Sequence, residues 1–240
     1  MLALTHDSVN LHRVPRTESA RLILPLLSLL LALPPMGCGK KAGAPHQVSP
    51  PPPVTLRSGS ELYESCLLCH STREMQRGPI LDGLPAWYVE HQLRKFRLGI
   101  RGRNPTNRAE LLMGSTAGQL QSAPDIHAVA SHIQSLPVPH HLLTVRGDPD
   151  KGRVLYAHCA PCHGDSAQGN KILRGPPLAG LEDWYQLDQL RKFKTRHRGY
   201  HPADTNGQIM AATVLALTDQ DLRDVVHYVA TELARAKAPQ

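Results

Sequence analysis

The chain has 240 residues, a net charge of +7 and an isoelectric point near 9.3. This length allows one or two domains, and the basic charge suits an acidic partner or an anionic surface. No basic block is interleaved with aromatic residues, so the sequence does not favour a nucleic-acid partner. Only 4% of residues are aromatic. A small domain with so few rings lacks large core fillers, and a buried cofactor would supply that apolar area.

The first 37 residues are predicted to be an export signal. Three arginines precede an apolar run over residues 22–33, which is too short to span a bilayer but fits a secretory signal. The run ends with Gly37 directly before Cys38. This resembles a bacterial lipoprotein signal, with Cys38 as the lipidated first residue of the mature chain. The alternatives are an uncleaved anchor, or a soluble protein cleaved elsewhere with Cys38 as a spare thiol.

Residues 38–57 are predicted to form a tether. They are rich in Pro, Gly, Ala and Ser, include the run Pro50 to Pro53, and show no hydrophobic period. Proline-rich chain rises about 3.1 Å per residue. Such a tether would hold the folded part a few tens of ångströms from a membrane.

The pattern Cys-x-x-Cys-His occurs twice, at residues 66–70 and 159–163. It places two thiols on one side of a helical turn with an imidazole beside them, which is the signature of c-type haem attachment. A zinc site built from both cysteine pairs is the main rival interpretation, and a redox-active dithiol is another. Two copies, each with an adjacent histidine, favour two covalent haems. The predicted attachment residues are Cys66, Cys69, Cys159 and Cys162, and the predicted proximal iron ligands are His70 and His163.

The two motifs lie in matching stretches of sequence. Gln-Leu-Arg-Lys-Phe recurs identically at residues 92–96 and 189–193, and Trp-Tyr recurs at residues 87–88 and 184–185. The offset is 93 residues before the motifs and 97 beyond them, because the second copy has four extra residues around 164–171. A period this long predicts tandem domains rather than a solenoid. We assign the domains to residues 58–137 and 146–236.

Each copy is predicted to be helical, which makes the fold all-α. Three helices are expected in each copy, and no strand alternation occurs. Thr218 and Asp148 are expected helix N-caps. The predicted helices span residues 58–66, 85–97 and 124–136 in the first copy, and 150–159, 182–194 and 218–236 in the second.

Met113 and Met210 are the predicted sixth ligands of the two irons. They occupy matched positions shortly before the last helix of each copy. A thioether is a soft ligand that raises the reduction potential relative to a second histidine. The alternative is that each methionine only fills the core.

Further matched residues are candidates for the surroundings of each haem. A ligating histidine usually donates its free N–H to a carbonyl, and Pro79 and Pro176 are placed to offer one; the alternative is that these prolines only shape a loop. Trp87, Tyr88 and Arg101, with Trp184, Tyr185 and Arg198, are candidate donors to the haem propionates. The alternative for the Trp-Tyr pairs is plain core. The basic stretches at 94–103 and 191–198 have three interpretations: they balance propionate charge, they steer an acidic partner, or they form a solvated face.

The order of these motifs resembles class I cytochrome c, and the duplication resembles two-haem cytochromes of the c-four type. This resemblance covers about residues 55–236. It implies two helical cytochrome c folds, each around one haem c, with the haems near a shared interface. Two departures lie in the first copy: Ser71 stands where Gly164 follows the second motif, and His132 stands in the place of Tyr228. The haem on Cys66 and Cys69 is therefore expected to be the unusual one.

The predicted function is electron transfer between periplasmic or membrane redox partners, without a catalytic residue. The expected partners are an oxidase, reductase or dehydrogenase with an acidic docking surface, and the membrane through lipidated Cys38. Export to the periplasm agrees with the resemblance, because bacterial haem c is attached outside the cytoplasm. Two alternatives remain open: a haem subunit docked to a dehydrogenase or oxidase, and a two-haem enzyme such as a peroxidase-like or thiosulfate-oxidising cytochrome.

Overall fold

The computed structural model describes residues 57–72 and 76–234, which lie in one compact unit, Pro52–Gln240. The predicted export signal, Cys38 and the tether up to residue 56 lie outside the described residues. Within the described part, none of the helices has both the length and the apolar character needed to cross a bilayer.

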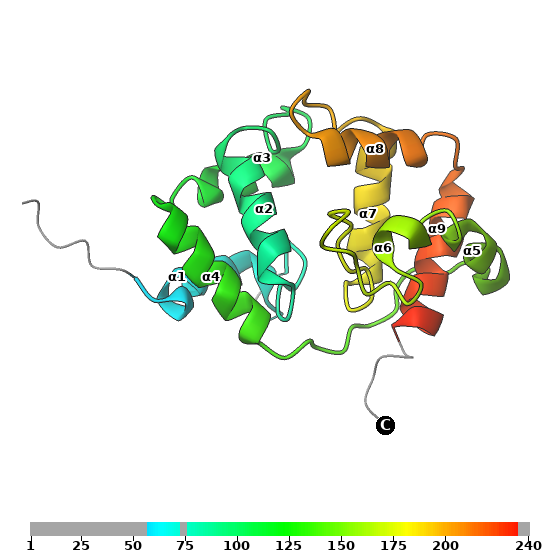
Figure 1. Ribbon diagram of the computed structural model, residues 1–240, viewed down its shortest axis with the longest axis horizontal. Coiled ribbons are helices and arrows are strands. Elements are labelled where there is room, and N and C mark those ends of the chain that lie inside the picture. Colours follow the sequence, from blue (N-terminus) through cyan, green and yellow to red (C-terminus); the bar gives the residue numbers. More distant parts are fainter. Residues whose placement is uncertain (1–56, 73–75, 235–240) are drawn as a thin grey trace, which may run out of the picture. The chain divides into compact units, whose positions relative to one another are not determined.

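The described residues fold into helices joined by loops (Figure 1). The only β-pairing among them is an isolated bridge between Asn170 and Gly175, so the all-α prediction is confirmed. The first half contains α1 (Gly59–His70), α2 (Ala86–Arg97), α3 (Arg108–Ala117) and α4 (Ala123–Ser135). The second half contains α5 (Pro149–Tyr156), α6 (Ala160–His163), α7 (Asp183–Lys194), α8 (Thr205–Thr213) and α9 (Asp219–Tyr228), which continues into a π-helical turn, Val229–Leu233.

Side-chain caps fix where several helices begin. Thr218 and Asp221 form a capping box at the start of α9, and Ser122 and Asp125 form another at α4. Asp148 accepts hydrogen bonds from the backbone of α5. These side chains satisfy N–H groups that have no partner within the helix. The predicted caps Thr218 and Asp148 are confirmed.

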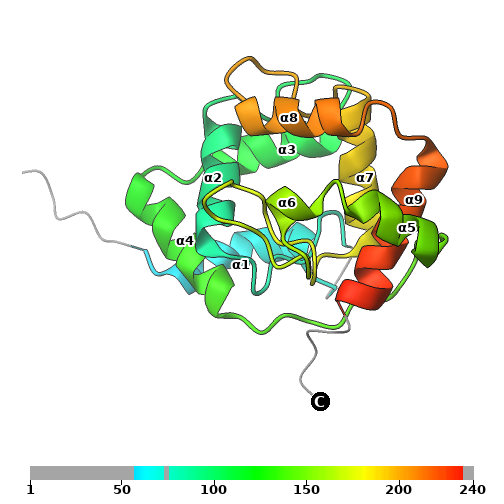
Figure 2. The same cartoon turned by 45° about the vertical axis from the view of Figure 1, so that its right-hand side comes forward.

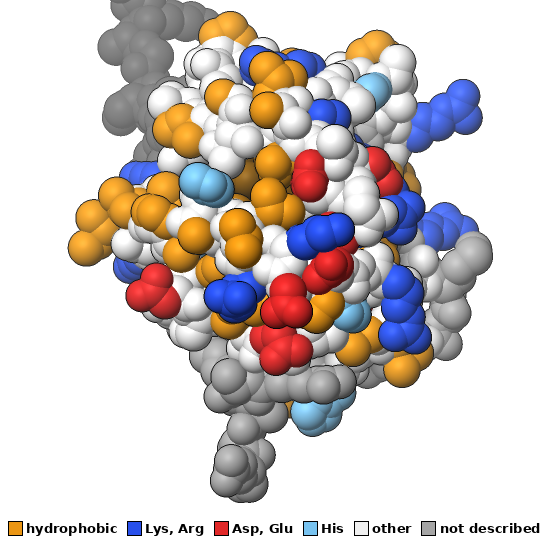
Figure 3. All heavy atoms as spheres, turned by 90° about the vertical axis from the view of Figure 1, so that its right-hand side faces the viewer, with side chains coloured by type: hydrophobic (Ala, Val, Ile, Leu, Met, Phe, Trp, Pro, Cys, Tyr) orange, Lys and Arg blue, Asp and Glu red, His pale blue; other side chains and the backbone are white. Residues whose placement is uncertain are grey.

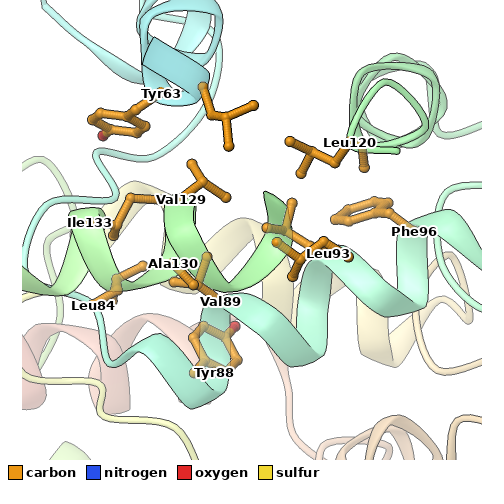
Figure 4. Close-up of a cluster of buried hydrophobic side chains, with 13 residues drawn as sticks. Tyr63, Leu84, Tyr88, Val89, Leu93, Phe96, Leu120, Val129, Ala130 and Ile133 are labelled. Carbon is orange, nitrogen blue, oxygen red and sulfur yellow. The ribbon is translucent and has the colours of Figure 1, made fainter. Parts of the chain in front are cut away.

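Each half has its own apolar core. In the first half α4 supplies Ile126, Val129, Ala130 and Ile133, each at most 1% exposed, against α1 and α2 (Figure 4). In the second half Leu222, Val225, Val226 and Val229 are the counterpart on α9 and its π turn. These residues recur at spacings of three and four, as the sequence predicts for one buried helix face.

The predicted helix bounds need correction at both Cys-x-x-Cys-His motifs. Helix α1 runs through the whole first Cys-x-x-Cys-His motif, whereas the second motif follows α5 and forms the separate short helix α6. Gly164, which ends α6, has a φ of 80°, while Ser71 after α1 has a φ of −138°. A positive φ strains any residue except glycine, so the extended exit of α1 accommodates serine.

Helices α3 and α8 are absent from the sequence prediction. The predicted ligands Met113 and Met210 lie inside these helices, each of which precedes the last helix of its half. In two views of the structure α3 and α8 lie near each other, above α2 and α7 (Figures 1 and 2).

Candidate haem sites

In the first half, the imidazole of His70 is held by the loop that follows α1. Its Nδ1 lies 2.6 Å from the carbonyl oxygen of Pro79. A carbonyl only accepts hydrogen bonds, so Nδ1 carries the proton and Nε2 is left with a free lone pair. A Cβ at Gly78 would come within 2.5 Å of the ring, so only glycine allows this close approach.

The second half repeats this arrangement. Nδ1 of His163 lies 2.8 Å from the carbonyl oxygen of Pro176. Burial lowers the pKa of both His70 and His163, and the hydrogen bond to the proline carbonyl partly opposes that shift. Both rings are therefore kept neutral, which is the form that binds a metal ion. The carbonyls of both prolines are the candidate acceptors that the sequence predicts.

The four motif cysteines do not form a disulfide. Burial raises the pKa of the Cys66 thiol, and it raises the pKa of Cys159 to about 11 with a smaller contribution from Cys162. Reactive dithiols need a lowered thiol pKa, which these surroundings do not provide. Nor do the pairs converge on one zinc site, because the described residues contain no cluster of three or more His, Cys, Asp or Glu side chains able to hold a metal.

A cleft in the second half brings the predicted ligands of one haem together. Cys159, Cys162, His163 and Met210 all line it. The rest of its wall is largely apolar and includes Leu178, Leu190, Phe193, Val214, Leu217, Val225, Val226 and Val229. Two cysteines, a neutral histidine and a thioether around an apolar cleft match the donors and surroundings that haem c needs.

In the first half, the corresponding residues gather around the first core. Cys66 and Met113 pack, partly buried, against this core. Asn107 and Glu110 each leave one buried polar atom, Nδ2 and Oε2, without a hydrogen-bond partner. Such orphaned atoms are rare in folded proteins. The amide of Asn107, the residue directly before α3, is therefore a spare donor.

The Trp-Tyr pairs are alike in the two halves. The rings of Trp87 and Tyr88 are 5.9 Å apart in an edge-to-face arrangement, and those of Trp184 and Tyr185 are 5.8 Å apart. Tyr185 lines the cleft of its own half, and Tyr88 lines the same cleft although it belongs to the first half. The departure at His132 keeps a similar ring contact, because His132 lies edge-on to Tyr63 with ring centroids 5.5 Å apart, and Tyr228 lies tilted against Tyr156 at 5.8 Å.

Arg101 and Arg198 meet at the junction of the halves. Each guanidinium lies over the phenylalanine of its own half, at 4.6 Å from Phe96 and 4.5 Å from Phe193. Arg101 donates two hydrogen bonds to Oε1 of Glu110. Burial acts to lower the pKa of Arg101, but the charge of Glu110, its hydrogen bond and the neighbouring tyrosines together raise that pKa. The position matching Glu110 is Gly207, and Arg198 lines the cleft.

Gln92 and Gln189 accept hydrogen bonds from both arginines, and the sequence alone predicts no role for either glutamine. Oε1 of Gln189 accepts from Arg101 at 3.0 Å and from Arg198 at 2.8 Å. Oε1 of Gln92 accepts from Arg101 at 2.7 Å and from Arg198 at 3.2 Å. Both glutamines belong to the five residues that recur identically in the two copies, and this repeat is the signal in the sequence that could have indicated them.

A second polar contact crosses the junction without a counterpart. Lys95 of the first half donates to Asp204 of the second at 2.5 Å. The matched Lys192 instead pairs with Asp188 in its own half at 2.6 Å. Burial lowers the pKa of Lys95, and its contact with Asp204 opposes that shift.

Comparison with known proteins finds relatives of the second half and of most of the chain. A family model described as cytochrome c matches residues 149–232. A thiosulfate dehydrogenase electron acceptor from Thiomonas intermedia is 30% identical over 186 residues, covering 70% of this chain and 78% of that protein. The chain belongs to the cytochrome c family. A protein of the same description from Stutzerimonas stutzeri is 29% identical over 181 residues, covering 69% of the chain and 78% of that protein.

The fold of the chain is that of a two-domain cytochrome. The cytochrome c4 structure from Acidithiobacillus ferrooxidans superposes with a TM-score of 0.57 at 23% identity, covering 70% of this chain and 98% of the other. Membership of the cytochrome c family implies covalently bound haem c, and the two sets of cysteine, histidine and methionine side chains fit that group.

Proposed function

We propose that this protein is a two-haem electron carrier. One haem c would be bound by Cys66 and Cys69, with His70 and Met113 as iron ligands. The other would be bound by Cys159 and Cys162, with His163 and Met210. The observation that carries the proposal is the repeated contact of each histidine with a proline carbonyl, because it leaves one ring nitrogen free for iron in both halves.

The protein's residues would bind and insulate the two cofactors. Haem c supplies reversible one-electron exchange at its iron. With a histidine and a methionine bound to each iron, no coordination site would be left for oxygen or peroxide, which favours a carrier over an enzyme. Arg198 and Asn107 would donate hydrogen bonds to propionates, because Arg198 lines the cleft and Nδ2 of Asn107 has no partner.

Partners would dock where the second haem comes closest to the surface. Leu173 and Ile209 line the cleft and are 51% and 55% exposed, and Arg174 lies beside them. An apolar rim with a basic residue suits a redox protein that presents an acidic surface. The face over α5, α8 and α9 carries acidic and basic side chains together, so on this face the attraction would be local (Figure 3).

The relatives favour a dehydrogenase as one partner. Two of them are described as electron acceptors of thiosulfate dehydrogenase. We propose that this chain also receives electrons from a dehydrogenase of sulfur compounds, either as a diffusing carrier or as a haem subunit docked to it. The protein would act in the periplasm, exported by residues 1–37 and tethered to a membrane through lipidated Cys38.

Intact-mass and redox measurements test the proposal. The exported protein should carry two haem masses and take up two electrons per chain. Both haems should give low-spin spectra with the weak far-red band of methionine–iron ligation. A single haem, or a high-spin haem in the resting protein, would refute the carrier function. Mass spectrometry of the mature N-terminus tests the tether, and an unmodified Cys38 would refute lipidation.

A further inference from the structure

A carboxylate from the second half reaches the loop that holds His70 in the first half. Glu182, the residue directly before α7, is 7% exposed. Its Oε2 accepts the backbone N–H of Ile80 at 2.8 Å, and the Gln76 amide donates to both carboxylate oxygens at 2.7 and 2.8 Å. Among the described residues no lysine or arginine forms an ion pair with Glu182.

The contact with Ile80 leads directly to the candidate iron ligand. The N–H of Ile80 and the carbonyl of Pro79 belong to the same peptide group, and that carbonyl accepts the proton on His70 Nδ1. The atoms therefore form one hydrogen-bonded chain from imidazole through peptide to carboxylate. Hydrogen bonds in such a chain polarise and strengthen one another. A negative charge at its far end makes the carbonyl a better acceptor and the imidazole more electron-rich.

The second half has no means of reproducing this contact. Pro85 occupies the position that matches Glu182, and Pro177 the position that matches Ile80. Proline has no backbone N–H to donate. Both ends of the contact are therefore missing around His163.

We propose that Glu182 is a positioning residue that lowers the reduction potential of the haem on Cys66 and Cys69 through the Pro79–Ile80 peptide. This inference rests on the proposed function, because it takes His70 as an iron ligand. An electron-rich imidazole and a nearby negative charge both favour the ferric iron, which carries the extra positive charge. The second half therefore sets the electron affinity of the first haem, and electrons settle preferentially on the second haem.

Glu182→Gln tests the proposal in the full-length protein with its haems. The amide keeps the size and an acceptor oxygen but removes the charge. Spectroscopic redox titration should show one haem with an electron affinity raised threefold to tenfold, where tenfold corresponds to 59 mV for one electron. The other haem should be unchanged. The paramagnetically shifted NMR signal of the His70 ring should move while that of His163 stays, which assigns the effect to the first haem.

Asp224→Asn is the matched control. Asp224 is also a buried acid of the second half, at 1% exposed, and it accepts from Asp148 N and Gln220 within that half. Removing its charge should change neither potential by more than twofold. Ile80→Pro, which copies Pro177, removes the donor but keeps the charge, and it should shift the same haem in the same direction if Glu182→Gln fails to fold.

The outcomes separate the two proposals. Two low-spin haems whose potentials are unchanged in Glu182→Gln, or shifted equally, would overturn this inference and leave the carrier function intact. A wild-type protein without a haem on Cys66 and Cys69 would overturn both.

Discussion

The guanidinium of Arg101 donates to Oε1 of Gln189 at 3.0 Å, although 88 positions separate them in the sequence. Arg198 donates to the same oxygen from the other side at 2.8 Å. Both guanidiniums are buried. Charged donors in such a place need acceptors, since an unsatisfied buried charge costs more than a neutral group. The junction between the halves is therefore held by polar contacts that each half supplies to the other.

Replacing Gln189 with alanine should weaken this junction. Two buried guanidiniums would each lose an acceptor, and we expect the free energy of unfolding to fall by about 2–4 kcal/mol. Urea unfolding followed by circular dichroism measures this loss. Gln119→Ala is the control, because Gln119 is exposed and its loss should cost below about 0.5 kcal/mol. Equal stability of the two variants would show that the junction does not contribute.

Removing either methionine should affect one haem at a time. Met210 lines the cleft with His163, and Met113 packs against the first core beside Cys66. Met210→Ala and Met113→Ala should each abolish about half of the far-red absorption band and lower the potential of one haem, because the soft thioether favours ferrous iron. Absorption spectroscopy with redox titration measures both effects. Complete loss of the band in one variant, with no change in the other, would contradict methionine ligation at both irons.

The sequence could predict the histidine–proline contacts because its repeat displays them twice. The cysteines, both histidines and the proline carbonyls stand at matched positions, and the structure places each proline carbonyl on its histidine. It could not predict helix α8, whose Met210 has few periodic apolar neighbours to reveal a helix face. Nor could it predict Glu182, because that contact depends on an unmatched residue and on how two halves meet in space.

Gly152 should tolerate no larger residue. It lies where α5 crosses α9, and a Cβ there would collide with the backbone carbonyl of Asp224. A backbone carbonyl cannot rotate out of the way as a side chain can, so Gly152→Ala must push α5 and α9 apart. We expect a loss of about 1–3 kcal/mol, typical of overpacking, measured as a lower urea midpoint. Arg153→Ala on the exposed side of α5 is the control, and a stable Gly152→Ala would mean that this crossing is looser in solution.

Asp219 should make stability depend on pH in acid. Its carboxylate accepts from Arg191 at 2.6 and 2.7 Å and from Arg223 at 3.0 Å. The hydrogen bond from Arg191, helped by Arg223, lowers the pKa of Asp219 from 3.8 to about 2, although burial opposes this shift. Because the folded pKa lies below the unfolded one, the stabilisation is complete above pH 4 and is lost as the pH falls towards 2.

The size of this effect should be small, because the Asp219 side chain is 53% exposed. We expect Asp219→Asn to cost below about 1 kcal/mol at neutral pH and to flatten the dependence of stability on pH between 4 and 2. Urea unfolding at several pH values measures the slope. In an Arg191→Gln background most of the difference should vanish, since the main partner of the carboxylate is gone. Equal slopes for the wild type and Asp219→Asn would show that the pair does not form in solution.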